Sequence, residues 1–285
     1  MIPQFGTNIT SSFFLWCEDR LTRVGGAIYT GQEQTFEYRD SDDCPSNMLS
    51  FYADENQFVF NGTGVPNYVT IDGATVYQGN LSTATGLLID HEKARVLVGT
   101  GFATDAAITG NFDTREINIY LTQDDEDAIL LSRDFIVDGE SHRRTKEQSA
   151  DEAILVPALI ITHGNGQNEP FALGGEQVSK DNIRAIVVTD SNHLLDSVQS
   201  LFQNAKDKGF KVFDQSAFPL GEFSHVKEPP YTYTGISDPP LAWAHISEVR
   251  RSKLDDRVRL NISLPKNLKV GFLDFTVETP IGVPT

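Results

Sequence analysis

The first element that the hydrophobic pattern predicts is an amphipathic helix. Apolar side chains recur at steps of three and four residues, at Phe14, Cys17, Leu21 and Val24. Hydroxyl residues 10–12 offer caps for its start, and Gly25 with Gly26 ends it. Residues 1–25 are therefore expected to form an N-terminal amphipathic helix. It is expected to dock on its own domain, with packing on a neighbouring subunit as the alternative.

Short β-type runs separated by turn residues follow, over residues 26–112. They cover residues 51–52, 57–60, 68–71, 75–77, 86–90 and 94–98. Asn61 with Gly62 and Asp72 with Gly73 are dipeptides that favour tight hairpin turns, because both residues of each pair tolerate positive φ. This pattern predicts an antiparallel β-sandwich or small barrel.

Residues 113–285 change to a pattern that mixes strands with one clear helix. Strands are expected at 116–121, 128–131, 154–162, 183–188, 211–213, 258–262 and 270–277, with an acidic turn at 124–127. The strands at 154–162 and 183–188 are nearly continuous apolar runs, typical of central strands that are buried on both faces.

The clearest helix in the chain precedes the strand at 211–213. Its apolar stripe consists of Leu194, Leu195, Val198, Leu201 and Phe202. Asp190 or Ser191 can cap its start and Gly209 can end it. The expected fold class is therefore α+β and β-rich, with the antiparallel module joined to an α/β layer in which one long amphipathic helix packs on a sheet.

Two segments are expected to be extended loops. Residues 140–152 are charged and almost free of apolar side chains, which favours an exposed loop or an ordering arm. Residues 215–242 are rich in Pro, Gly and Tyr, which favours a stiff surface excursion that lies on a partner.

Charge narrows the possible partners. The chain has 40 acidic and 23 basic side chains, a formal net charge of -17, and its first 150 residues carry most of the surplus. Such a surface repels phosphate, so sequence-reading nucleic-acid binding and docking on anionic lipid are not expected. The charge serves plain solubility or, alternatively, a conduit through which DNA slides without being held.

The apolar runs and the surroundings of the two cysteines indicate the compartment of the protein and the state of its thiols. No run is long and apolar enough for a membrane span, and the first residues do not resemble a signal peptide, so synthesis and retention in the cytoplasm are expected. Cys17 lies on the apolar helix face and is expected to be a buried thiol, whereas Cys44 lies in a polar loop. A disulfide between them is not favoured in a reducing cytosol.

Motifs for nucleotide binding and serine hydrolysis are not found in the sequence. Residues 163–166 superficially resemble an oxyanion-hole loop, but a glycine turn after a strand explains them better. Asp190, Ser191 and His193 are close in sequence, and helix capping explains them better than nucleophilic catalysis.

Metal binding has equally little support. The six histidines have no metal-ligand spacing and no cysteine companions: His91, His142, His163, His193, His225 and His245. Residues 124–127 lack the spacing of a calcium loop and are expected to be a solvated hairpin tip. No catalytic, cofactor-binding or metal-binding residues are therefore assigned, and no enzyme activity is expected.

A carbohydrate-binding or hydrolytic sandwich is the alternative from a different functional class. Trp243, Tyr231 and Tyr233 form the one sequence cluster of aromatic residues suited to a sugar platform. Paired carboxylates for glycoside hydrolysis carry no sequence spacing, because the fold brings them together.

Two passages resemble a known group of proteins. The β-type sequence at residues 69–73 and 88–97 is similar to the β module of phage neck and adaptor-associated virion proteins. The sequence at residues 168–175, 183–191 and 194–198 is similar to uncharacterised virion proteins of tailed phages. The resemblance covers about residues 60–205 and brings no catalytic residues with it.

The resemblance implies a ring-forming subunit of the neck or tail terminator, assembled in the host cytoplasm and located in the virion. Its expected partners are further copies of itself, with a hexamer preferred over a dodecamer, together with the head connector or adaptor and the tail tube or sheath. DNA would pass through without specific binding. Another tail or baseplate component is the nearest alternative.

Overall fold

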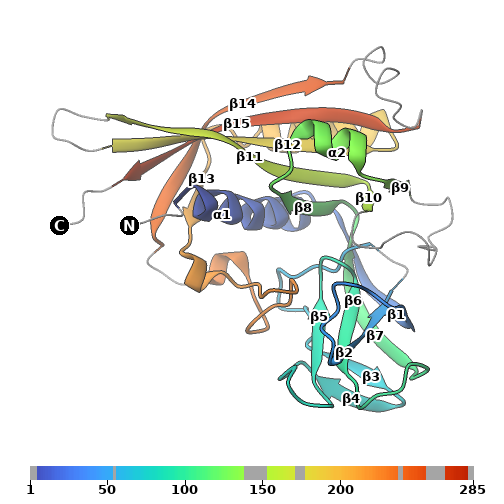
Figure 1. Cartoon of the computed structure of the whole chain (residues 1–285). Helices are drawn as coiled ribbons and strands as arrows, with labels where there is room; N and C mark the ends of the chain where they lie inside the picture. Colours follow the sequence, from blue (N-terminus) through green and yellow to red (C-terminus); the bar gives the residue numbers. More distant parts are fainter. Residues whose placement is uncertain are drawn as a thin grey trace.

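The computed structural model describes residues 5–53, 56–137, 153–170, 177–236, 240–254 and 267–281. Its elements form two parts, a seven-stranded β module and a six-stranded sheet with helices on both faces (Figure 1). The predicted loop at 140–152 and the predicted strand at 258–262 lie outside the described residues. The β-rich α+β class predicted from the sequence is confirmed.

The N-terminal helix α1 spans Phe5–Asp19 and continues through a π-helical turn over Arg20–Val24. It ends where the glycine pair predicts, because the Gly25 amide donates to the carbonyl of Arg20 at 2.8 Å. The predicted start was wrong. Thr10 is inside the helix and donates its hydroxyl to the Gly6 carbonyl at 3.0 Å, so it does not cap the first turn.

The β module is one antiparallel sheet that curls into a barrel-like shape. Its strands are β1 Ile28–Tyr38, β2 Met48–Tyr52, β3 Tyr68–Ile71, β4 Ala74–Tyr77, β5 Leu87–Asp90, β6 Arg95–Gly99 and β7 Ile108–Arg115. They hydrogen-bond in the order β4-β3-β7-β1-β2-β6-β5. Asp72 and Gly73 form the tight β3–β4 turn with φ of 49° and 83°, as their sequence predicts.

Two predictions within the module were wrong. Residues 57–60 form no strand, and Phe58 makes only an isolated bridge to Thr114. Asn61 and Gly62 form no hairpin turn. Instead, the Asn61 side chain donates to Asp19 at 3.1 Å and accepts from the Tyr233 amide at 2.8 Å, so it links three segments that are distant in sequence.

The second part is a mixed six-stranded sheet in the order β13-β14-β15-β12-β11-β8. The strands are β8 Asn118–Thr122, β11 Ala158–Pro170, β12 Gln177–Thr189, β13 Gly209–Val212, β14 Ala242–Lys253 and β15 Lys269–Ile281. Only β8 and β11 run parallel among its pairs. A separate parallel pair consists of β9 Phe135–Val137 and β10 Ile154–Val156.

Helices cover the two faces of this sheet unequally. One face buries α1 and α3 (Asn192–Gln203) in a large core, and the other buries the short helix α2 (Glu126–Ser132) in a smaller one. The predicted helix is confirmed as α3, and Ser191 caps it by accepting from the Leu194 amide. It ends at Asn204, before the predicted Gly209, which instead begins β13.

The predicted strand at 128–131 was also wrong, because these residues belong to α2. The Asp125 side chain accepts from the Ala128 amide at 2.8 Å, and Glu126 and Asp127 occupy the first turn. The acidic run that was expected to form a hairpin tip is therefore a helix start, where negative charge is favourable.

The excursion predicted at 215–242 lies on the protein's own core where it is described. Leu220, Val226 and Ile236 are buried in the core that contains α1, and just before the segment the amide of Phe213 donates to Ser12 of α1 at 2.9 Å. Two short 3-10 turns, Gln215–Ala217 and Tyr233–Gly235, shape the segment. α1 is thus enclosed between the sheet and this segment within one chain.

Candidate functional site

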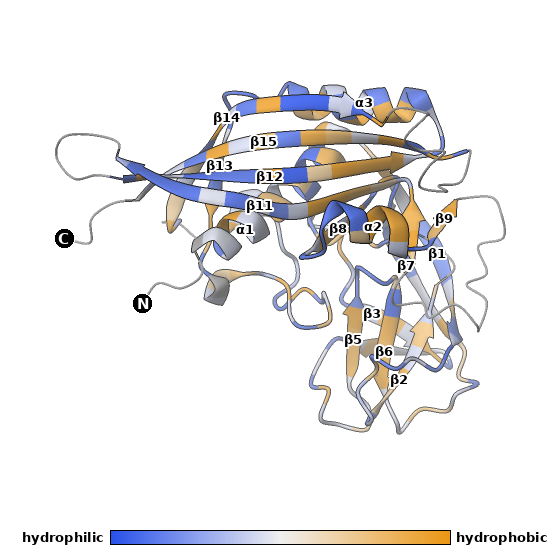
Figure 2. Ribbon diagram, turned by 45° about the horizontal axis from the view of Figure 1, so that its top comes forward, coloured by the Kyte–Doolittle hydropathy of each residue, from blue (hydrophilic) through white to orange (hydrophobic). Residues whose placement is uncertain are grey.

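The six-stranded sheet extends well past its apolar core. Pairing of β8 with β11 ends at Thr162, whereas pairing of β11 with β12 continues to Pro170. Pairing of β12 with β15 continues to Ile281. Residues 166–170, 177–181 and 277–281 thus form a three-stranded extension, here called the sheet arm, and Figure 1 shows it on the side of the two termini. Figure 2 shows hydrophilic colouring over much of this end of the sheet.

The edge of the sheet arm is not a plain strand. A β-bulge lies between His163 and Gly166 in β11, where the register against β12 shifts. The prediction of a glycine turn at 163–166 was therefore wrong, since the strand continues through these residues. A bulge twists an edge strand and limits its pairing with foreign strands. His163 itself shares a hydrogen bond of 2.8 Å with the Thr10 hydroxyl.

A polar groove on the sheet near α2 is lined in part by Arg184, Glu248, Arg250 and Asp274. Arg184 donates to Asp274 at 2.6 Å and also contacts Glu126, while Arg250 donates to Glu248 at 2.7 Å. The two guanidinium groups hold the three neighbouring carboxylates, so the charges beside the groove are paired within the chain. Paired charges on an exposed face are hydrated and screened, so they do not create a strong electric field that would attract a charged small ligand.

The three aromatic residues singled out in the sequence are not brought together as a platform. Tyr231 is buried, with its ring 6.1 Å from that of Phe60, and Tyr233 is partly buried against Phe213. Trp243 is different, because 58% of its surface is exposed on β14. The Lys211 ammonium lies 6.0 Å from the centre of its ring, a cation–π distance.

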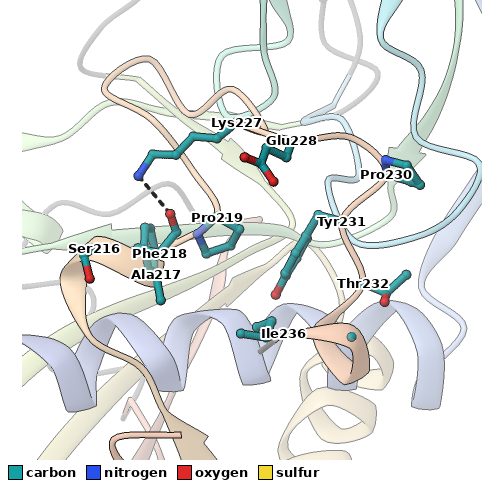
Figure 3. Close-up of a pocket in the computed structure, with 11 residues that line it drawn as sticks. Ser216, Ala217, Phe218, Pro219, Lys227, Glu228, Pro230, Tyr231, Thr232 and Ile236 are labelled. Atoms are coloured by element: carbon teal, nitrogen blue, oxygen red, sulfur yellow. Dashed lines mark hydrogen bonds between the residues drawn. The ribbon is translucent and has the colours of Figure 1, made fainter. Parts of the chain in front are cut away.

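A cleft opens in the segment over α1. Phe218, Pro219, Pro230, Tyr231 and Ile236 supply its apolar lining, and its volume is about 380 Å³. Figure 3 shows the Lys227 ammonium donating to the Phe218 carbonyl, a hydrogen bond of 2.9 Å. The one cation drawn in the cleft is therefore engaged in closing the loop on itself.

A buried ion pair lies where α1 meets the β module. Glu18 of α1 and Arg115 at the end of β7 are both almost fully buried, with 3.6 Å between Oε1 and Nη2. Burial raises the pKa of Glu18 to about 7, although the Arg115 charge and Asn61 oppose this rise. Arg115 also donates to Gln57 Oε1 at 2.5 Å and lies over the Phe60 ring. Sequence periodicity gave no sign of this pair, because its members are almost 100 residues apart.

A second charged network is internal to the module. Arg95 donates to Asp90 at 2.8 Å and to both carboxylate oxygens of Asp43 at 2.6 Å. Lys93 and Tyr52 join the same network. Burial raises the pKa of Asp90 against the pull of Arg95, whereas hydrogen bonds from Arg95 and Lys93 outweigh burial and hold the pKa of Asp43 far below its usual range. Because Tyr52, Asp90 and Arg95 come from β2, β5 and β6, respectively, this network links the three strands.

The remaining predicted groups stay apart. Ser191 caps α3, and no hydrogen bond or ion pair is recorded between it and His193 in the described structure. His91 is fully buried against the Val59 carbonyl, while His245 is exposed and 4.0 Å from Asp207. Within the described ranges, no group of three or more His, Cys, Asp or Glu side chains is placed to hold a metal ion. Cys17 is buried and free, as predicted, and Cys44 is free and partly buried.

No family model matches the chain, and no curated protein matches it significantly. Among the helices of the described ranges, none is long and apolar enough to cross a membrane.

Proposed function

We propose that this chain is a structural subunit that works by self-association, in a ring at the neck or tail terminator of a tailed-phage virion. The observation that carries the proposal is the sheet that runs beyond its own core as a polar arm. In the edge strand of this arm residues 166–170 are mostly exposed, whereas several arm residues of β12 and β15 are buried, so the β11 edge is the part that is free to contact neighbouring molecules.

The arrangement of charge supports the same use. The ion pairs of the sheet face and of the module are satisfied within the chain, and the charge surplus is acidic. An acidic subunit surrounding a passage would leave a DNA backbone unbound, because like charges repel. The proposed partners are further copies of this chain, the head connector or adaptor, and the tail tube or sheath.

The test is the mass and shape of the purified full-length chain. We expect a discrete oligomer, with six copies preferred and twelve as the alternative, that appears as rings in negative-stain electron microscopy. Duplex DNA at low salt should not be retained. A chain that stays monomeric at all accessible concentrations, with or without a connector protein, would contradict the proposal.

Glycan binding is the second candidate, and the exposed Trp243 favours it. An exposed indole is a stacking surface for a sugar ring. Binding to a glycan array that is lost in Trp243→Ala, by a chain that remains monomeric, would favour this candidate over the structural subunit.

A further inference from the structure

One face of the β module carries two exposed tyrosines side by side. Tyr68 of β3 and Tyr77 of β4 are directly opposite each other in the antiparallel register, with ring centres 5.6 Å apart. They are 46% and 63% exposed, respectively, whereas Val69, the next residue of β3, is buried in the module core. The alternation of side chains along the strands therefore turns both rings to the solvent side of the sheet. In Figure 1 this hairpin lies at the lower end of the module, away from the six-stranded sheet.

A row of threonines continues the same face. It crosses four neighbouring strands, β4, β3, β7 and β1, and consists of Thr75, Thr70, Thr109 and Thr35. Each is at least partly exposed, so the row offers hydroxyl groups that donate and accept hydrogen bonds. Thr70 and Thr75 are each two positions from a tyrosine on the same strand, so the row lies beside the two rings. With strands about 4.8 Å apart, the row spans about 14 Å. These six residues are here called the tyrosine platform.

The chemistry of the tyrosine platform narrows what it can bind. None of its six side chains is charged at neutral pH, although the chain has a formal net charge of -17. A nucleic acid requires cations for its phosphates, and the platform supplies none. A protein interface requires an apolar core, and beside its two rings the platform has only threonines. Glu33 and Glu37 lie two positions to either side of Thr35 on β1 and are exposed, so they repel an acidic ligand at this end of the row. A neutral ligand rich in hydroxyl groups fits these conditions.

We infer that the tyrosine platform binds a neutral polysaccharide chain that runs across β4, β3, β7 and β1. The C–H face of a pyranose ring packs on an aromatic ring, and the distance between the two tyrosine ring centres is close to the length of one sugar unit. The rings are tilted by 55° to each other, so successive sugar units are turned relative to one another. The threonine hydroxyls exchange hydrogen bonds with the sugar hydroxyls beside the rings. This inference goes beyond the proposed structural role and holds for a monomer as well as for a ring.

Affinity electrophoresis of the full chain through gels that contain a polysaccharide tests the site. The neutral probes are hydroxyethylcellulose, xylan, galactomannan and dextran, and polygalacturonate is the acidic comparison. We expect at least one neutral probe to slow the migration of the wild type and polygalacturonate to leave it unchanged. The dependence of migration on probe concentration gives the dissociation constant.

Variants separate ring stacking from hydrogen bonding. Tyr68→Ala with Tyr77→Ala, the ring variant, is expected to bind at least about tenfold more weakly, because both stacking faces are removed. Tyr68→Phe with Tyr77→Phe keeps the rings and is expected to stay within about threefold of the wild type. Thr70→Val with Thr109→Val, the row variant, keeps the side-chain shape and is expected to bind about three- to tenfold more weakly, because two hydroxyls are lost. Tyr29→Ala removes an exposed tyrosine elsewhere on β1 and is the matched control, with binding expected as in the wild type. Circular dichroism establishes that each variant is folded.

Several results would overturn the inference. A wild type that no neutral probe slows would remove the sugar site and leave the proposed structural role standing. A folded ring variant that binds as tightly as the wild type would show that the tyrosine pair serves only its own hairpin. Should the ring variant not fold, an unchanged affinity of the row variant would decide against the site. Binding that is lost in Trp243→Ala and kept in the ring variant would move the sugar site to the exposed indole.

Discussion

Glu18 and Arg115, at the junction of the two parts, are ionisable residues that folding removes from water, at a cost in desolvation free energy. Glu18 and Arg115 are buried together at 3.6 Å, a distance longer than a hydrogen bond. Burial also lowers the pKa of Arg115, although Glu18 opposes this. A buried pair of this kind recovers only part of its desolvation cost, so stability is expected to respond to pH at this point.

Replacing Glu18 by Gln tests this cost. The pKa of Glu18 is raised to about 7 in the fold from 4.5, so the folded protein holds a proton that the unfolded chain releases between these values. The wild type therefore loses stability from this group as pH rises through that window. The unfolding free energy of E18Q minus that of the wild type should increase by up to about 3 kcal/mol from pH 4.5 to 7.

Urea unfolding at several pH values measures this difference, and Glu248→Gln at a partly exposed pair is the control. A pH-independent difference between E18Q and wild type would show that folding does not raise the pKa of Glu18.

His91 is expected to act in the opposite direction. Burial, followed by the Arg115 charge, lowers the pKa of His91 to about 3 from 6.5. The stability it contributes is complete above pH 6.5 and is lost as pH falls towards 3, because only the unfolded chain takes up the proton. The loss amounts to roughly 5 kcal/mol at most. Acid unfolding followed by circular dichroism should be shallower in His91→Gln, and an unchanged acid midpoint would refute the assignment.

At the scale of elements, the position of α3 depends on a close approach to β15. The Gln199 amide donates to the Ser252 carbonyl at 2.8 Å and to that of Phe272 at 3.3 Å. It fits because residue 271 is glycine. A Cβ there would be 2.5 Å from Gln199 Nε2 and 2.9 Å from Leu195 Cδ1. Helix and strand therefore meet at a distance set by one missing side chain.

Gly271→Ala is expected to lower the unfolding free energy by about 1–3 kcal/mol, because the helix must shift away from the sheet. Gly64→Ala is the control, since its Cβ would have no neighbour closer than 3.8 Å. Denaturant unfolding compares the two. Equal effects of both substitutions would show that α3 is not held as closely as the structure indicates.

At the scale of the whole molecule, one aromatic side chain of the module segment is part of the core of the other part. The module core lies within residues 36–112, and the larger core contains α1 and the sheet. Phe60 comes from the module segment but packs in the larger core, with ring centres 5.9 Å from Phe14 and 6.1 Å from Tyr231. Phe60 thus couples the two parts, together with polar contacts such as the Glu18–Arg115 pair and the hydrogen bond from the Ile119 amide to Gln57.

Phe60→Ala should cost about 3–5 kcal/mol and uncouple the unfolding of the two parts. Calorimetry of the wild type is expected to show one transition, and that of the variant two. Phe112→Ala is the comparison. Phe112 stacks on Phe58 at 4.2 Å inside the module core, so its removal leaves the contacts of Phe60 in place. A single transition in F60A would show that other contacts couple the cores.

The sequence by itself determined the elements whose signal is local. The stripe of α3, its Ser191 cap, the Asp72 and Gly73 turn and the doubly buried strands all follow from residue period and turn chemistry. It failed where a local signal is ambiguous, as at 128–131, where a short apolar run suits a strand but the preceding carboxylates start a helix.

Tertiary structure alone decided which distant side chains meet. The folding of the module and the sheet around α1 brings Glu18 to Arg115 and His163 to Thr10. It also buries Tyr231 while Trp243 stays exposed. No spacing along the chain encodes these contacts, because each one joins segments that are brought together by burial of the cores. The same packing leaves Trp243 and the outer edge of the sheet arm, residues 166–170, exposed.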